Sequence, residues 1–139
     1  MKTYEYRFNI PVLDKNKDEI IARTILFFEL LQKDYPELAP HWFKARSKKK
    51  ARPYSPAELE REFDRKYVVG LFSSMNENES CGITLQYMPE INGCFVVSMS
   101  VKADMDDPSN SERYMEFSMS AVRMLEPINS FVRIFPQIY

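Results

Sequence analysis

The segment spanning residues 80–103 constrains the fold most, because it has the pattern of two strands joined by a tight turn. Apolar residues alternate with polar ones from Ile83 to Tyr87, and large apolar residues recur at every second position from Phe95 to Val101, with Val96, Ser98 and Ser100 between them. A period of two residues is typical of a strand that buries one face. Asn92-Gly93 supplies the positive-φ residues that a tight reversal needs. The segment therefore predicts an antiparallel hairpin.

Similar patterns predict the remaining elements. We expect strands at 4–10 and 67–75, helices beginning near Asn16, Ser55 and Asp107, and a short strand or extended tail at 130–139. Residues 36–54 contain three prolines and six basic residues, and we expect a short helical turn and an exposed loop there. The order predicts an α+β fold in which a mostly antiparallel sheet of four to five strands packs against two or three helices. With 139 residues, no repeat and no linker, a single domain over 1–139 is expected.

The overall charge argues against binding to polyanions. Nineteen basic and twenty acidic side chains give a formal net charge of −1, so the whole molecule has no field that attracts nucleic acid or an anionic membrane. The N-terminus has neither a basic leader nor an apolar block, and no run of eighteen apolar residues occurs. We expect a cytoplasmic protein with no membrane partner.

Residue types suited to catalysis are scarce. Nucleophilic catalysis needs a base, and the one histidine, His41, lies in a proline-rich segment without a nucleophile motif. Cys81 and Cys94 lack metal-ligand spacing and are interpreted as reduced core thiols, with a disulfide between them as the alternative. Three glycines cannot form a phosphate-binding loop. No catalytic, cofactor or metal site is predicted, and the chain is not expected to be an enzyme.

Two charged features are candidates for binding a partner. Acidic residues cluster at Glu77 and Glu79 and at 104–107, where they either present negative charge to a partner or keep a loop soluble. The basic loop at 44–52 has three alternatives: a solvated loop, a protein-binding edge, or a contact with nucleic acid. The basic loop has no interleaved aromatic residues for base stacking, which argues against the contact with nucleic acid.

The string DYPELAPHWFKARSKKKARP at residues 34–53 resembles a motif of the Immunity protein 52 family. In this motif an acidic and proline-containing lead precedes a Trp, a Ser and an Ala, here Trp42, Ser47 and Ala51. Fainter similarity continues along most of the chain, through Gly82 to Pro127. The segment after Ala51 departs from the family by being shorter and more charged.

The resemblance implies an α+β immunity protein of a bacterial polymorphic toxin system. Such a protein would bind and neutralise a cognate toxin in the cytoplasm, here a nuclease with a restriction-endonuclease-like fold, in a cell that uses contact-dependent or type VI delivery. Acidic groups suit a basic nuclease cleft, and those of the helix from Ser55 are Glu58, Glu60, Glu62 and Asp64. Aromatic residues suit an interface centre. The residues predicted to contact the partner are therefore Trp42, Tyr54, Glu58, Glu62, Glu77, Glu79, Asp104, Asp106 and Asp107.

An adaptor or nucleic-acid-associated protein that uses the basic loop at 44–52 is the alternative function. A small enzyme ranks third. The sequence identifies neither the toxin nor the surface that binds it, and it leaves a homodimer open.

Overall fold

The computed structural model describes residues 2–12, 17–45, 52–63, 69–73, 82–88, 93–127 and 129–135. The elements follow in the order β1 (Lys2–Pro11), α1 (Lys17–Asp34), the short 3₁₀ helix η1 (Pro36–Leu38), β2 (Trp42–Ala45), β3 (Arg52–Pro53), α2 (Pro56–Phe63), β4 (Val69–Ser73), β5 (Gly82–Met88), β6 (Cys94–Ala103), α3 (Pro108–Leu125) and β7 (Asn129–Phe135).

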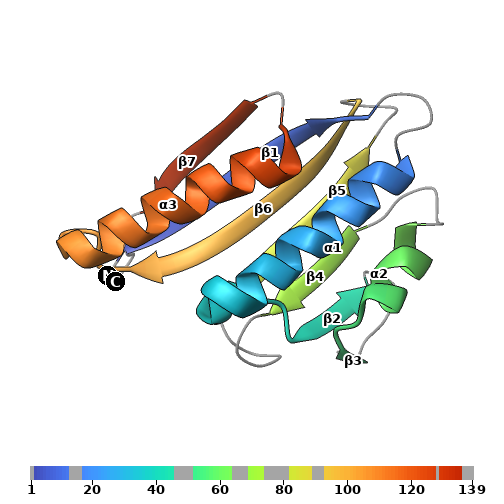
Figure 1. Cartoon of the computed structure of the whole chain (residues 1–139), viewed down its shortest axis with the longest axis horizontal. Helices are drawn as coiled ribbons and strands as arrows, with labels where there is room; N and C mark the ends of the chain where they lie inside the picture. The colour runs from blue at the N-terminus through green and yellow to red at the C-terminus, as the bar shows by residue number, and fades with distance from the viewer. Residues whose placement is uncertain are drawn as a thin grey trace.

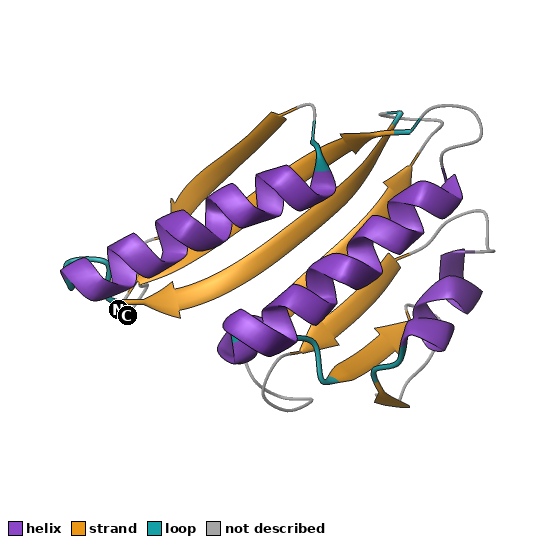
Figure 2. Ribbon diagram, viewed as in Figure 1, coloured by secondary structure: helices purple, strands orange, loops and turns teal. Residues whose placement is uncertain are grey.

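The strands form one seven-stranded sheet in the order β3-β2-β4-β5-β6-β1-β7. Every strand pair in the described part of the chain is antiparallel. The three α-helices cover one face of the sheet (Figure 1), and the opposite face carries no described helix (Figure 2). The predicted α+β class is thus confirmed, with a sheet wider than expected.

The extra width comes from residues 36–54, where the prediction of a helical turn followed by an exposed loop was only partly right. The turn is present as η1, but β2 then pairs with β4, and β3 pairs with β2. Strands of four and two residues are too short for alternation to reveal. Pairing with distant residues, rather than local pattern, makes them strands.

The predicted hairpin is confirmed in β5 and β6, where Leu85 lies opposite Val97. Gly93 adopts a φ of +62°, the left-handed conformation that glycine reaches without steric cost. The N-terminal strand β1 pairs with β6 on one side, with Tyr6 opposite Met99, and with β7 on the other. Residues 130–139 were predicted as a strand or a tail, and β7 is the strand.

Aromatic side chains fill the layer between the sheet and the helices. Phe117 of α3 is fully buried, and its ring lies 5.3 Å from Tyr6, 5.5 Å from Tyr35 and 6.2 Å from Phe27, measured between ring centroids. Offset and edge-on pairs of this kind add stabilisation beyond the burial of apolar area. They fix α3 against both the sheet and α1.

Two arginines tie α1 and α3 together at opposite ends. Arg113 donates two 2.9 Å hydrogen bonds to the Glu37 carboxylate and a third, of 3.0 Å, to the Asp34 carbonyl. Arg23 donates to the Leu125 carbonyl at 3.3 Å, where α3 ends. Forked arginine–carboxylate pairs fix orientation as well as distance. The two helices therefore form one layer.

The described helices are too short or too polar to cross a membrane. The Cys94 thiol is free and half-buried, whereas Cys81 lies outside the described residues.

Candidate protein-binding groove between two helices

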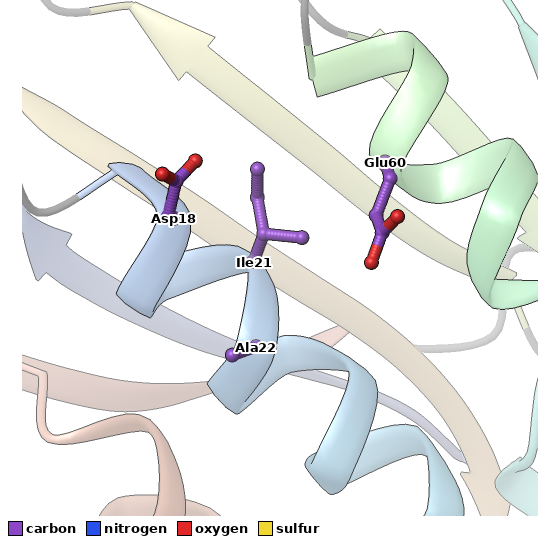
Figure 3. A pocket seen from close by; sticks show the side chains of 4 residues that line it. All are labelled: Asp18, Ile21, Ala22 and Glu60. Carbon is purple, nitrogen blue, oxygen red and sulfur yellow. The ribbon is translucent and has the colours of Figure 1, made fainter.

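A shallow groove of about 340 Å³ lies between α1 and α2. Asp18, Ile21 and Ala22 of α1 and Glu60 of α2 line it. In Figure 3 the two carboxylates lie on facing helices, with the Ile21 side chain between them. The groove thus has an apolar floor and an acidic group on each wall.

The start of α2 fixes the wall that carries Glu60. The Ser55 hydroxyl accepts a 3.3 Å hydrogen bond from the Glu58 backbone N–H, and Pro56 occupies the first helical position. Both features stabilise a helix N-terminus. Leu59 is fully buried and anchors this helix to the core. Glu60 lies at the surface, facing α1.

The two groove carboxylates differ from their acidic neighbours in their salt bridges. Glu19 pairs with Arg23 at 2.7 Å, and Glu58 pairs with Arg52 at 3.1 Å. Within the described part of the chain, no salt bridge joins Asp18 or Glu60 to a basic side chain. Both are exposed, so their negative charge is directed to the solvent.

Several of the predicted contact residues have structural roles. The Glu58 side chain is only 17% exposed and is held by Arg52 and, at 3.2 Å, by Arg61. Tyr54 is half-buried and packs edge-on against Phe28, with the ring centroids 5.5 Å apart. Burial raises the pKa of the Tyr54 phenol well above its usual value. Both side chains help to hold α2 and β3 against α1.

Trp42, another predicted contact residue, does not line the groove. It is half-buried on β2, opposite Pro53. The next residue, Phe43, is in register with Phe72 and through it with the buried Ile83, so alternation places Trp42 on the sheet face without helices. Trp42 and the groove are therefore on different sides of the sheet.

The predicted aspartates build the turn before α3. Asp107 caps the helix by accepting hydrogen bonds from the Ser109 N–H at 3.0 Å and the Ser109 hydroxyl at 2.8 Å. These bonds lower the pKa of the Asp107 carboxyl. Asp104 accepts from the Asp106 N–H at 3.1 Å. Figure 1 places this turn at the opposite end of the molecule from α2, so Asp104, Asp106 and Asp107 do not form one surface with Glu58.

Some predictions fall on residues without a described side chain. Glu62 is in α2, but only its backbone is described, whereas Glu77 and Glu79 lie outside the described residues. Residues 46–51 of the basic loop also lie outside the described residues. Its last member, Arg52, is engaged with Glu58. His41 is exposed, and the described residues include no group of three potential metal ligands.

Asp18 and Ile21 were not predicted as site residues. Glu60 was predicted to belong to an acidic helix that could face the partner, although only Glu58 and Glu62 of that helix were among the predicted contacts. The position of α2 beside α1, which creates the groove, has no local signal.

No family model and no curated protein matches the sequence. Among solved structures, the fold is similar to that of the Pseudomonas aeruginosa T6SS protein PA0821, with a TM-score of 0.59 and 9% sequence identity. The match covers 96% of this chain and 40% of that protein, so this chain spans less than half of its length. At this identity the likeness shows a shared fold.

Proposed function

We propose that this protein is a non-catalytic immunity protein that binds and neutralises a bacterial toxin in the cytoplasm, with the α1–α2 groove as a contact surface. The toxin class that the sequence resemblance implies is a nuclease with a restriction-endonuclease-like fold. The observation that carries the proposal is the groove itself, in which Asp18 and Glu60 flank the apolar Ile21 and Ala22.

Charge complementarity connects the groove with a nuclease. A protein that binds nucleic acid presents lysine and arginine to the phosphates. Such a surface is attracted by carboxylates that have no internal counterion, and this attraction accelerates association. Blocking that surface would prevent the toxin from reaching its substrate.

The dimensions of the groove suit a basic side chain of the partner. Lysine and arginine have an apolar stem and a charged head. The stem would lie on Ile21 and Ala22, and the head would lie between Asp18 and Glu60. At about 340 Å³ the groove is at the small end of the range for small-molecule sites, which favours a protein contact.

Two further observations support this function. The motif around Trp42 resembles that of an immunity family, and a T6SS protein has a similar fold. Together they favour a role linked to toxin delivery between cells.

The test uses the toxin encoded beside this gene. We expect co-expression of the wild-type protein to restore growth of cells that produce this toxin. The Asp18→Lys/Glu60→Lys double variant should weaken binding to a catalytically inactive toxin by about 100-fold or more, measured by calorimetry.

A matched control is Glu112→Lys/Glu116→Lys, which changes the net charge equally at exposed positions on α3, away from the groove. It should leave the dissociation constant within about threefold of wild type. Equal binding by the groove variant and wild type would exclude the groove. Failure of wild type to bind the toxin, together with salt-sensitive binding to DNA or RNA, would instead favour the basic loop at 44–52 and a nucleic-acid role.

A further inference from the structure

Exposed apolar side chains gather at one edge of the sheet. Six large apolar side chains are exposed among the described residues, and Leu26 on α1 is one of them. The other five belong to α3 and β7 and form what we call the edge patch: Met115 (65% exposed), Met119 (50%), Val122 (41%), Val132 (48%) and Ile134 (55%). Single exposed apolar residues are ordinary, but a contiguous group marks an interaction site.

Strand register shows that both β7 members of the patch face the helices. Val132 and Ile134 lie opposite Tyr6 and Tyr4 of β1, and residues directly opposite share one face of a sheet. Tyr6 is buried against Phe117 of α3, at 5.3 Å between ring centroids. The middle of α3 therefore lies level with Val132.

The α3 members of the patch occupy one flank of the helix. Met115, Met119 and Val122 are spaced i, i+4, i+7, which places them in one row. Arg113, on the other flank, reaches Glu37 beside α1. The row therefore lies on the side of α3 away from α1, which is the side of β7 (Figure 1).

The patch also borders an open strand edge. β7 is last in the strand order, next to β1, and no described strand pairs with its outer side. An edge strand offers its backbone N–H and C=O groups to another strand. Here the open edge and the apolar side chains are adjacent.

We propose that a second copy of this chain occupies the edge patch, with the two β7 strands pairing antiparallel about a two-fold axis. A single extended peptide could pair with β7 but would leave the α3 row in water. A second copy brings its own α3 row, so that apolar surface meets apolar surface across the axis. Two-fold interfaces require this self-complementarity.

Charge argues against one register of the pair and is compatible with the register centred on Val132. If the axis passes through Val132, this residue lies opposite its counterpart, and Arg133 lies opposite Phe131. If the axis passes through Arg133, two arginines face each other, which is unfavourable. Within each chain, Arg133 lies opposite Glu5 of β1. The register centred on Val132 therefore keeps like charges apart.

The area is adequate for such a dimer. The five side chains expose on the order of 450 Å² of apolar surface. Strand pairing adds the backbone of the seven-residue β7. Together these approach the roughly 800 Å² per partner of a standard interface.

The test measures mass by sedimentation equilibrium over about 1 µM to 1 mM chain. We expect a mass twice the 16.4 kDa of one chain at the upper concentrations. Val132→Lys should give a monomer, because two lysines would meet on the axis. Leu26→Lys, equally exposed but on α1, should still dimerise, and circular dichroism should show that both variants are folded.

Mixing two charge variants tests the register. Val132→Lys and Val132→Asp should each be monomeric alone, and a mixture should form a heterodimer, since opposite charges then meet at the axis. A monomeric wild type, a dimer that survives Val132→Lys, or a mixture without heterodimer would overturn the proposal. If the wild type is monomeric and Val132→Lys abolishes toxin binding, the patch belongs to the toxin instead.

Failure here is distinguishable from failure of the toxin-binding proposal. The groove lies beside α2, near the β3 end of the sheet, whereas β7 forms the other end. Asp18→Lys/Glu60→Lys should leave the dimer intact, and each surface can thus be rejected alone.

Discussion

Individual acidic residues differ in whether they have a partner within the described structure, and this difference separates residues that stabilise the fold from those proposed to bind a toxin. Glu58 forms a salt bridge with Arg52, and Asp107 accepts a hydrogen bond from the first turn of α3. Asp18 and Glu60 have no such salt-bridge partner in the described structure and remain available to a partner. Acidic composition alone cannot make this distinction, because the sequence does not show which carboxylates already have a counterion. Glu60 was predicted to lie on an acidic helix, whereas no feature of the sequence pointed to Asp18.

Tyr54 gives a prediction at the scale of one residue. Its pKa is raised mainly by burial, so the folded state holds the phenolic proton more tightly than the unfolded state. The stabilisation is fully present below a pH of about 10, the pKa of a phenol in the unfolded chain, and is lost as the pH rises above that value. For this one group, the unfolding equilibrium constant increases by at most about tenfold for each pH unit.

The measurement is urea unfolding of wild type and Tyr54→Phe between pH 7 and 11.5. The variant should lose stability less steeply above pH 10, because it has no phenol to ionise. The pH 7 values of each protein serve as its own reference. Parallel curves for the two proteins would show that Tyr54 does not contribute to alkaline unfolding.

At the scale of elements, sequence patterns predicted those helices and strands that are marked by their own residues. The hairpin, the first helix and α3 were predicted from alternation, from apolar stripes and from the Asp107-Pro108 start, and all are present. In α3, the buried face consists of Tyr114, Phe117, Ala121 and Leu125, spaced as one apolar stripe. β2 and β3 were missed, since their short sequences become strands only through pairing, β2 with β4 and β3 with β2.

The start of α3 provides a prediction for an element. Asp107→Ala removes the side chain that caps Ser109 and should lower the melting temperature by a few degrees. Asp107→Asn should retain most of the capping, because an amide oxygen also accepts from the backbone. Asp106→Ala, one residue away and exposed, is the control and should melt like wild type.

The pH dependence of this effect has a definite sign. The pKa of Asp107 is lowered in the folded state by its bonds to Ser109. The stabilisation is therefore present above the unfolded value near 4 and is lost as pH falls below it. Thermal melts at pH 7 and pH 2.5 should differ less for Asp107→Asn than for wild type. An equal difference would argue against the cap as the titrating group.

At the scale of the whole molecule, stability should be graded across the sheet. β1 and β6 share the longest register and lie under α3, whereas β2 and β3 are short. Native-state hydrogen exchange should therefore show the slowest amides in β1 and β6 and the fastest strand amides in β2 and β3. Uniform protection across the sheet would contradict this gradient.

The arrangement of the helices over the sheet also explains why the groove could not be predicted from the sequence. Its walls come from helices that begin about forty residues apart, and their approach depends on the burial of Leu59 and Tyr54 against α1. Composition and periodicity describe each helix but not their contact. The edge patch was hidden for the same reason, because it requires both the strand order and the rotation of α3.

The position of β1 has a consequence for synthesis on the ribosome. This strand is made first, yet its two neighbours in the sheet are β6 and β7, which begin at Cys94 and Asn129. Until those residues leave the exit tunnel, the nascent chain carries an aromatic strand without neighbours, exposed to chaperones and to other nascent chains. Long-range pairing of this kind slows folding, so translation of the last strand is expected to limit when the native sheet can close.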